Sequence, residues 1–543
     1  MPIMTREIPS VATTANADFD AIVVGAGFGG LYMLHKLRDE LGLKVCVFDR
    51  AGDVGGTWYW NRYPGARSDT ESFVYCYSFD SEMLQDWVWS DRYPLQPEVL
   101  SYLEYVADRL ELRRDIQFNC GVIAAHFNED TNLWSVTTDT GKNLTAKYFV
   151  TALGLLSVTN VPDIKGLENF VGEQYHTGAW PTQGVSLEGK RVGVIGTGST
   201  GVQCVTAIGP EAKHLTVFQR SPQYSVPARH GAMPKDFIAG VKANYEQVWT
   251  DVRNSGVAFG FEESQIPCTE ATEISREKVF EQAWQKGGGF RFMFGTFNDI
   301  VTDRQSNEEA AQFIRSKISQ IVKDPATAKM LTPTDLYAKR PLCDAGYYET
   351  YNRENVTLVD IKKDPIEEIT STGVQTTQDM HELDILIFAT GFDAVDGSYT
   401  KIDIRGRNGI QIKDKWADGP SSYLGMANSD FPNMFMILGP NGPFTNLPPS
   451  IETQVEWVSD LISHMQDTGM ACIEATSDAE ATWTETCEEI ANFTLFPQAE
   501  SWIFGANIPG KPNKVMFYMA GLGSYRQVLH DVADGEYEGF TSQ

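Results

Sequence analysis

The chain has 543 residues, of which 42% are hydrophobic and 21% charged. This is the composition of a globular protein, and the chain is too long for one hydrophobic core, so we expect roughly two to four domains. The formal charge of −28 argues against nucleic acid or an anionic membrane as the partner, because both are bound by clustered Lys and Arg side chains.

The N-terminal segment Met1–Asp20 is polar and lacks the apolar centre of a secretion signal, which predicts a frayed tail. No apolar run approaches the roughly 18 residues of a membrane-spanning helix. No two of the eight cysteines are separated by four or fewer residues, which excludes CxxC and CxxxxC pairs. We therefore expect free thiols, no metal site and a cytoplasmic, reducing location. The cysteines are Cys46, Cys76, Cys120, Cys204, Cys268, Cys343, Cys472 and Cys487.

The first recognisable unit is a strand, a glycine turn, a helix and a second strand. The apolar run Phe19–Val24 leads into a GxGxxG motif, and leucines then recur at helical spacing before a second run, Leu43–Phe48. The motif glycines are Gly25, Gly27 and Gly30, and Asp49 follows Gly25 by 24 residues. Such glycines let the backbone approach a pyrophosphate at the helix N-terminus, and the acid accepts hydrogen bonds from ribose hydroxyls. This unit predicts a dinucleotide site.

An aromatic segment, Gly55–Asp69, follows that unit directly. It holds Trp58, Tyr59, Trp60 and Tyr63 between glycines and a Pro-Gly turn, and ends in a carboxylate. Dense aromatics are usually core, but the flanking glycines favour a loop over a helix here. We expect a rigid wall beside a flat ring cofactor.

The strand, turn and helix pattern recurs with one informative change. The strand Arg191–Ile195 precedes a second glycine motif, Gly196–Gly201, and a further strand, Leu215–Phe218. Arg220 stands 24 residues after Gly196, where the first unit has its acid. An arginine there is a bidentate partner for a 2′-phosphate, whereas the alternative is a plain surface charge. We assign FAD to the first unit and NADP rather than NAD to the second.

Helical patterns dominate from 233 to 335, and one of them ends at Asp324-Pro325. Within this region, the tract Gly287–Phe294 has three glycines followed by aromatics, which fits either a mobile joint or a helix cap followed by core. Strands resume at Val356 and at Leu383–Ala389. Later segments rich in Pro, Gly or aromatic residues predict rigid loops of the kind that carry sites; they are Gly439–Pro449 and Ser501–Asn507.

A family resemblance becomes specific between the two nucleotide units. The segment Phe170–Pro181 matches the FxGxxxHxxxW(P/D) fingerprint of type I Baeyer–Villiger monooxygenases, whose flavin-containing relatives usually have Tyr or Phe in place of Trp180. Gly55–Asp69 and Phe388–Asp393 also match that family, so that the resemblance runs from about Phe19 to the end of the chain. The fingerprint His176 resembles a residue that links domains, and it is not expected to attack substrate.

Within the family, two further segments resemble the cyclohexanone monooxygenase group, namely Leu336–Leu342 and Gly439–Pro449. The resemblance implies that NADPH reduces FAD, and that O2 then forms a C4a-peroxyflavin. This species inserts one oxygen beside a ketone carbonyl, converts cyclic ketones such as cyclohexanone to lactones, and also oxidises sulfides. Two alternatives stay open: an N- or S-oxygenating flavin-containing monooxygenase, and an NADPH-dependent flavin reductase that serves a partner protein. We expect a monomer.

Arg340 is the main catalytic candidate. A guanidinium does not lose its proton in proteins and stabilises nearby anions, which peroxide attack on a carbonyl requires. Asp69 is expected to orient it, and Lys339 to pair with the phosphate or ribose of NADP. Without the resemblance, adjacent Lys and Arg are more often a solvated pair. One departure from the family is Ala228-Arg229-His230, which replaces a short Gly-Asn turn and puts the edge of the nucleotide or substrate site in doubt.

These inferences predict an α/β fold with two Rossmann-like dinucleotide-binding domains, of the flavoprotein monooxygenase type, and a helical insert. The expected domains are 1–152 with 392–543 for FAD, 160–232 with 336–391 for NADP, and 233–335 for the insert. The cofactor-binding candidates are Gly25, Gly27, Phe28, Gly30, Asp49, Arg50, Gly56, Thr57, Trp58, Tyr63, Asp69, Gly196, Thr197, Gly198, Ser199, Thr200, Gly201, Arg220, Ser221, Lys339, Arg340 and Trp502. The substrate-pocket candidates are Leu153, Leu156, Phe259, Phe290, Phe444, Leu447, Trp502 and Phe517.

Overall fold

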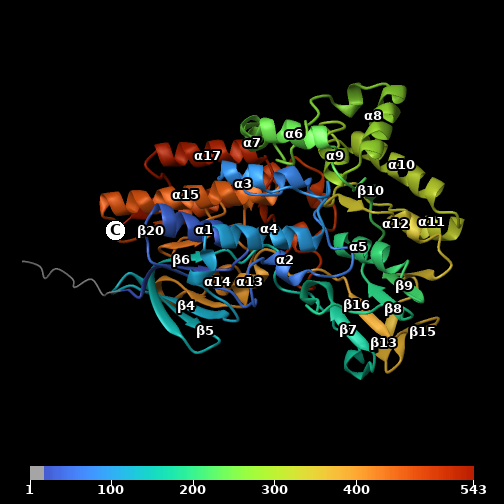
Figure 1. Ribbon diagram of the computed structural model, residues 1–543, viewed down its shortest axis with the longest axis horizontal. Coiled ribbons are helices and arrows are strands. Elements are labelled where there is room, and N and C mark those ends of the chain that lie inside the picture. The colour runs from blue at the N-terminus through green and yellow to red at the C-terminus, as the bar shows by residue number, and fades with distance from the viewer. Residues whose placement is uncertain (1–16, 543) are drawn as a thin grey trace, which may run out of the picture.

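The computed structural model describes residues 17–542, so most of the N-terminal segment expected to fray lies outside the described residues. Two sheet-centred units lie side by side, and a group of helices, α6 to α11, runs along one edge of both (Figure 1). In this part of the chain no helix is long and apolar enough to cross a membrane, and no cluster of metal-ligating side chains is present.

The first unit is built on a sheet that has eight strands in the described part of the chain, with β1 at its centre between β2 and β6. All three are parallel, and β18 extends the sheet parallel to β6. The strands β4 and β5 pair antiparallel beside β6. The strands are β1 (Phe19–Val24), β2 (Val45–Phe48), β3 (Ile116–Gln117), β4 (Val122–Asn128), β5 (Leu133–Thr138), β6 (Asn143–Thr151), β17 (Asp403–Arg405) and β18 (Met434–Met436).

Helices cover this sheet and bury a large common core with it. The first glycine turn is tight because side chains have no room in it. A Cβ on Gly25 would lie 2.3 Å from the carbonyl oxygen of Ala152, and one on Gly30 would lie 1.7 Å from that of Gly25. Glycine therefore lets helix α1 start directly against the strand ends. The principal helices are α1 (Phe28–His35), continued by a π-helical stretch η1 (Lys36–Glu40), then α3 (Ser81–Asp86), α4 (Gln96–Arg109), α15 (Leu447–Thr468), α16 (Ser477–Asn492) and α17 (Leu522–Asp534).

The second unit has a sheet of five strands among the described residues, all parallel, in the order β12-β9-β8-β16-β7. Its glycine turn repeats the packing of the first. A Cβ on Gly196 would lie 2.4 Å from the carbonyl oxygen of Ala389, and one on Gly201 would lie 2.2 Å from that of Gly196. Helix α5 (Ser199–Ile208) starts there. The strands are β7 (Glu173–His176), β8 (Arg191–Ile195), β9 (His214–Gln219), β12 (Val356–Asp360) and β16 (Ile385–Phe388).

The helical segment between the units packs against both of them. Its first helices contribute Trp249 and Val252 to the core of the first unit, whereas its later helices contribute Trp284 and Ile314 to the core of the second. Asp324 caps helix α11 by accepting a hydrogen bond from the Thr327 amide at 2.8 Å, so that Asp324-Pro325 also begins a helix and does not only end one. The helices are α6 (Lys235–Ala243), α7 (Tyr245–Asn254), α8 (Glu273–Lys286), α9 (Gly289–Phe294), α10 (Arg304–Ile321) and α11 (Pro325–Leu331).

The aromatic segment contains a short helix, α2 (Thr57–Trp60), where the sequence predicts only a loop. That prediction is wrong for these four residues. Gly56, at φ 52°, turns the chain into the helix, and the Asn61 side chain donates to the carbonyl oxygen of Thr57 at 2.9 Å and closes the turn. The rest of the segment is irregular, as predicted.

Short elements connect or border the two units. They are α12 (Tyr347–Thr350), α13 (Gly397–Thr400), α14 (Ile412–Lys415), β10 (Ser225–Pro227), β11 (Leu342–Asp344), β13 (Ile366–Thr370), β14 (Gly373–Thr376), β15 (Met380–Glu382), β19 (Gly442–Pro443), β20 (Ile473–Ala475), β21 (Phe517–Tyr518) and β22 (Phe540–Ser542). The 3-10 turns are η2 (Ser72–Val74), η3 (Leu112–Asp115), η4 (Leu167–Asn169), η5 (Thr177–Ala179), η6 (Cys268–Glu270), η7 (Arg407–Gly409), η8 (Phe496–Gln498) and η9 (Trp502–Phe504).

The chain crosses between the units twice, and the two crossings run side by side. The amide of Asn160 donates to the carbonyl oxygen of Gly391, and that of Asp393 to Val158, both at 2.9 Å. Since the strands of each sheet lie on their own side of these crossings, we propose the domains 1–152 with 392–543, 160–232 with 336–391, and 233–335. All eight cysteines lie in the described part and are free thiols, as predicted, and the structure buries each of them.

Candidate active site

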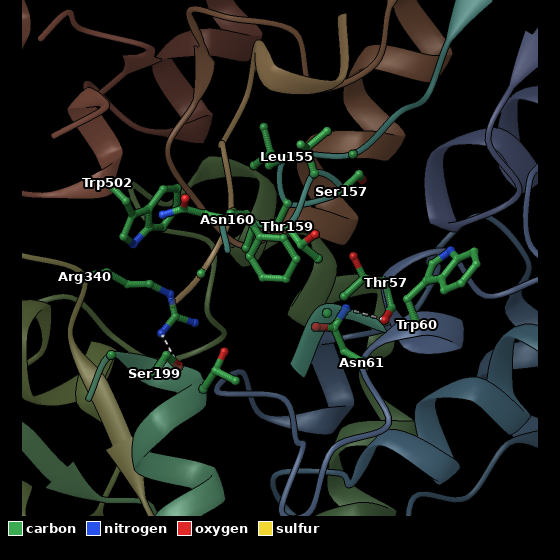
Figure 2. A pocket seen from close by; sticks show the side chains of 18 of the residues that line it. Thr57, Trp60, Asn61, Leu155, Ser157, Thr159, Asn160, Ser199, Arg340 and Trp502 are labelled. Atoms are coloured by element: carbon green, nitrogen blue, oxygen red, sulfur yellow. Dashed lines mark hydrogen bonds between the residues drawn. The ribbon is translucent and has the colours of Figure 1, made fainter. Parts of the chain in front are cut away.

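A cavity of about 1560 Å3 lies where the glycine turns of the two units face each other. It is bounded by the carboxyl ends of β1 and β8, which is where open parallel sheets bind nucleotides. Every predicted site residue lines this cavity except Gly30 and Gly201. These two glycines serve close packing of helix on turn, as their crowded Cβ positions show. Figure 2 shows Arg340 and Trp502 on one side of the cavity, facing Thr57 and Trp60 on the other.

The first glycine turn presents bare backbone to the cavity. The Cβ position of Gly27 lies 3.3 Å from the Cα of Gly56, so that two glycine segments pass each other with no side chain between them. No side chain caps the N-terminus of α1 at Gly27. Phe28, Gly56 and Thr57 also line the cavity here. Uncapped helix amides beside a cavity fit a pyrophosphate, so the donors present suit FAD.

Asp49 does more than the sequence predicts. Its two carboxylate oxygens accept hydrogen bonds from the amides of Ala26 at 2.6 Å and Ala51 at 2.7 Å, and so hold the glycine turn against the end of β2. Burial raises the pKa of Asp49, and these hydrogen bonds oppose the rise. Beside it, Arg50 lies over the ring of Trp60, 5.2 Å from its centre, and donates to the carbonyl oxygen of Ser157. Contact of Asp49 with a ribose stays a prediction.

The aromatic segment joins the two units. Trp58 is buried and packs edge-on against Tyr75, with ring centres 5.7 Å apart. The Tyr63 hydroxyl donates to the Oε1 of Gln203 at 2.7 Å. Because Gln203 lies on α5 of the second unit, this segment is both a wall of the cavity and a tie between its two sides.

The second glycine turn is open where a ligand has to approach. A Cβ on Gly198 would meet nothing within 4 Å, and no side chain caps α5 at this residue. Thr197 is tied to the neighbouring strand end through a bond from its hydroxyl to the carbonyl oxygen of Ser221 at 3.0 Å. Thr200 lines the cavity one residue into the helix. This turn fits the second pyrophosphate.

Two cations lie on the rim of the second turn. Arg220 lines the cavity, and among residues 17–542 no carboxylate forms an ion pair with it. Lys339 also lines the cavity and is held by Asp335, with its Nζ 2.5 Å from the carboxylate. An unpaired guanidinium beside an open phosphate cradle suits the 2′-phosphate of NADP.

Asp69 and Arg340 form the polar centre of the cavity. The Asp69 carboxylate is only 3% exposed, and its Oδ2 lies 2.7 Å from the Nη1 of Arg340. Ser199 bridges the pair: its hydroxyl donates to Asp69 Oδ2 at 3.2 Å and accepts from Arg340 Nη1 at 3.1 Å. Gln203 donates to the other oxygen, Oδ1, at 3.1 Å. A buried carboxylate with this many donors holds the guanidinium in one place.

Sequence reasoning missed Gln203, although a signal was present. It stands four residues after Ser199, so both side chains project from the same face of α5. It also missed Asn446, which lines the cavity and is only 1% exposed. The Nδ2 of Asn446 donates to the carbonyl oxygen of Val74, whereas its Oδ1 has no partner in the described part of the chain. An acceptor left open beside a cavity fits a ligand N–H or O–H.

Aromatic rings line the cavity that holds the guanidinium. Phe259 and Phe290 stack with centres 4.0 Å apart, and the Arg340 guanidinium lies 5.3 Å from the centre of Phe290. Phe517 packs edge-on against Phe444 at 5.3 Å and against Trp502 at 6.3 Å. The remaining predicted pocket residues also line the cavity, namely Leu153, Leu156 and Leu447. Apolar walls beside a cation that is held by a buried carboxylate suit a neutral organic substrate.

His176 lies outside the cavity lining, at the crossing between the units. Its Nδ1 accepts from the Gly178 amide at 3.0 Å, and its Nε2 lies 3.5 Å from the Thr390 hydroxyl. Burial lowers the pKa of His176 and favours its neutral form. The Ala228–His230 segment also lies outside the lining, with Ala228 buried against Tyr93 and Cys343. The departure at Ala228 therefore does not alter the cavity wall.

The tract Gly287–Phe294 ends helix α8 and then contributes Phe290 to the cavity wall. Gly287 ends α8 at φ 80°, Gly288 follows at φ 99°, and α9 then buries Phe292 and Met293. Phe290 alone among these aromatics stacks near the guanidinium. The cap-and-core interpretation describes this geometry, and movement of the tract stays a prediction.

Comparison with known proteins agrees with this geometry. A family model described as flavin-binding monooxygenase-like matches residues 20–238. A Baeyer–Villiger monooxygenase of Pseudooceanicola batsensis is 62% identical over 97% of this chain and 96% of its own. A phenazine N-monooxygenase of Lysobacter antibioticus is 56% identical over 96% of each chain. The crystal structure of cyclohexanone monooxygenase from Rhodococcus sp. Phi1 bound to NADP+ superposes with a TM-score of 0.96, at 58% identity, over 97% of this chain and 99% of that one.

The chain therefore belongs to the Baeyer–Villiger monooxygenase family. It is an FAD- and NADPH-dependent monooxygenase with the two-dinucleotide fold predicted from its glycine motifs.

Proposed function

We propose that the enzyme inserts one oxygen atom between the carbonyl carbon of a ketone and a neighbouring carbon. Cyclic ketones such as cyclohexanone become lactones, and sulfides are secondary substrates. In the balanced reaction, ketone, O2, NADPH and a proton give lactone, NADP+ and water. The observation that carries this proposal is the ion pair between buried Asp69 and partly buried Arg340, which holds a positive charge beside the ring of Phe290 in the cavity.

When bound, FAD supplies two-electron transfer from NADPH and the activation of O2. The chain supplies the electrostatics around that chemistry. Arg340 keeps its proton and stabilises the negative charge that develops on oxygen during insertion. Asp69, Ser199 and Gln203 keep the guanidinium in place, so that little reorganisation is needed when charge develops.

The apolar rings have a separate role in this proposal. Phe290 lies against the guanidinium, and Phe259 stacks on Phe290. Excluding water there strengthens the interaction of the cation with developing charge and protects reactive oxygen from loss as peroxide. Phe444, Leu447 and Phe517 line the cavity as further apolar contacts for the ring of a ketone.

The same proposal assigns the cofactor residues. The turn at Gly25, Gly27 and Phe28 holds the FAD pyrophosphate, and the turn at Gly198 and Ser199 holds that of NADP. Arg220 binds the 2′-phosphate, and Lys339 binds a phosphate or ribose oxygen nearby. The observation that supports NADP is Arg220, which lines the cavity and forms no ion pair within residues 17–542.

A second candidate is N-oxygenation of a flat aromatic heterocycle, because a relative 56% identical to this chain is a phenazine N-monooxygenase. A nitrogen nucleophile attacks the oxygen donor and needs no carbonyl addition, so N-oxygenation depends less on an anion stabiliser than ketone oxidation does. Substitution of Arg340 should therefore reduce ketone oxidation more than N-oxygenation.

The test is product analysis with NADPH and air. The purified enzyme is given cyclohexanone in one reaction and phenazine in another, and products are identified by mass spectrometry. The proposal predicts a lactone that carries one oxygen atom from 18O-labelled O2. N-oxide formation from phenazine without any lactone from cyclohexanone would support the second candidate instead.

We also infer that the enzyme works as a monomer in a reducing cytoplasm. Eight buried free thiols support the reducing location. A single-species mass near 60.4 kDa in light scattering is the expected result, and a stable dimer would contradict the monomer.

A further inference from the structure

Glu71 lies two residues after Asp69 but does not line the cavity. Its side chain is 7% exposed and receives two guanidinium groups, those of Arg92 and Arg291. Burial opposes ionisation, yet the two arginines hold the pKa of Glu71 below its usual value. The Glu71 carboxylate is therefore charged at neutral pH, and we name Glu71, Arg92 and Arg291 the Glu71 clamp.

The clamp grips both ends of the glycine turn that leads into α9. Arg92 donates to Glu71 at 2.9 Å and, through its other nitrogen, to the carbonyl oxygen of Lys286 at 2.6 Å. Lys286 is the last residue of α8. Arg291, on the far side of the turn, donates to the same Oε1 of Glu71. One carboxylate thus holds the chain before and after two positive-φ glycines.

Helix α9 has six residues, too few to be stable through its own hydrogen bonds. It packs directly on the chain that follows Arg340: a Cβ on Gly289 would lie 2.5 Å from the carbonyl oxygen of Leu342. Phe292 and Met293 anchor α9 in the core of the second unit, and the Gly288 amide donates to the carbonyl oxygen of Pro227 at 2.9 Å. The Glu71 clamp adds a charged attachment at Arg291, directly beside Phe290.

Helix α9 also carries Phe290, the residue next to Arg291. The ring of Phe290 covers the Arg340 guanidinium at 5.3 Å and stacks on Phe259 at 4.0 Å. The short segment 69–71 therefore makes two attachments. Asp69 fixes the guanidinium, and Glu71 fixes the helix that carries the ring over it.

We propose that Glu71 is a positioning residue for oxygen insertion, which acts by holding α9 so that Phe290 stays over Arg340. Without the clamp, α9 moves on its glycine turn, water reaches the guanidinium, and reducing equivalents leave as hydrogen peroxide in place of lactone. This inference rests on the proposed function for its catalytic consequence. The holding of α9 is a physical property that is measured without turnover.

The test compares Glu71→Gln with a matched control, Glu474→Gln. Glu474 is also a buried carboxylate, 9% exposed, and is paired with Arg407 at 2.6 Å on the first unit, outside the cavity lining. Hydrogen–deuterium exchange of the full enzyme is followed at residues 287–294. Glu71→Gln should speed exchange there about tenfold, because local opening becomes easier, whereas Glu474→Gln should not. If exchange at residues 287–294 were the same in Glu71→Gln as in the wild type, the proposal that Glu71 holds α9 would be wrong.

The second readout is the hydrogen peroxide formed per NADPH in the presence of ketone. Glu71→Gln should raise the peroxide formed per NADPH several-fold in the wild-type background. In a Phe290→Ala background it should raise the peroxide by less than about twofold, because the Phe290 ring that covers Arg340 is already absent. Equal, additive effects in both backgrounds would show that Glu71 does not act through Phe290.

Arg291→Gln and Arg291→Lys test the clamp from its other side, and they replace Glu71→Gln if that variant does not fold. Arg291→Gln should reproduce the faster exchange and the peroxide leak, and Arg291→Lys should restore most of both because the charge is kept. If the wild type formed no lactone, the proposed function would be wrong. The hydrogen–deuterium exchange result would still show whether Glu71 holds α9.

Discussion

Asp69 and Arg340 are 271 residues apart in the sequence, and their side chains meet at 2.7 Å in the cavity between the two nucleotide-binding units. Ser199, at the start of the helix expected to face NADP, touches both. The Arg340 guanidinium is thus attached to the aromatic segment of the first unit and to helix α5 of the second. Under the proposed function, NADP binding and oxygen insertion would share these contacts.

Arg220→Ala tests the assignment of the second unit. The Arg220 guanidinium should strengthen the binding of NADPH by contacting its 2′-phosphate. NADH lacks this phosphate. Losing one charged hydrogen-bonded contact costs roughly 1.5–3 kcal/mol, so KM for NADPH should rise by at least about tenfold and KM for NADH should change little. Steady-state kinetics with both nucleotides checks this. Equal use of the two nucleotides by the wild type would remove the basis for the assignment.

Gln203→Leu tests whether the amide of α5 positions Asp69. The substitution removes the donor to Asp69 Oδ1 and the acceptor for Tyr63 while keeping similar volume. We expect lactone formation to fall by roughly tenfold, about the value of one hydrogen bond to a charged group, with FAD content unchanged. Gln203→Glu keeps the shape but places a second carboxylate beside Asp69, so it should be worse. If Gln203→Leu formed as much lactone per NADPH as the wild type, Ser199 alone would be sufficient to position Asp69.

A buried acid outside the cavity lining predicts how stability depends on pH. Glu452 lies on α15, 1% exposed, and accepts hydrogen bonds from the amides of Ser78 at 2.5 Å and Phe79 at 3.2 Å. Burial raises the pKa of Glu452 to about 7, against an ordinary value of 4.5. The folded protein therefore binds this proton more tightly than the unfolded chain, and the contribution of Glu452 to stability falls as pH rises from about 4.5 to about 7.

Glu452→Gln keeps the shape and removes the titration. The stability of this variant relative to wild type should increase between pH 5 and pH 8, by at most roughly 3 kcal/mol. Thermal unfolding of both proteins across this range checks the prediction, with Glu474→Gln as the control for loss of a buried carboxylate. A difference between Glu452→Gln and wild type that stays constant with pH would show that Glu452 does not titrate in this window.

The sequence predicts the framework of this enzyme well because its signals are local. Strands β1 and β8 have the bounds expected from their apolar runs, Phe19–Val24 and Arg191–Ile195. The glycine turns follow from motif spacing, because only glycine fits where the helix touches the preceding carbonyl oxygen. These features depend on a few neighbouring residues, and so they can be read without a tertiary structure.

The parts that sequence reasoning missed depend on how distant segments meet. The spacing of Ser199 and Gln203 puts both on one face of α5, but no spacing in the chain encodes the orientation of α5 that brings this face to Asp69. Similarly, the second role of Asp49, holding the turn through Ala26, appears only when the strand ends are placed. The short helix α2 was missed because flanking glycines, which usually break a helix, here set its start.

Arg340→Ala tests the central claim most directly, by measuring lactone and hydrogen peroxide formed per NADPH consumed. The variant should bind FAD and oxidise NADPH, since the glycine turns are untouched. Lactone formation should fall far more, because removing a preorganised charge stabiliser costs roughly 2–4 kcal/mol, and the missing equivalents should appear as peroxide. Arg340→Lys should recover only part of the loss, since an ammonium lacks the planar fork that meets Asp69 and Ser199. Lactone formed by Arg340→Ala at the wild-type rate and coupling would contradict the account.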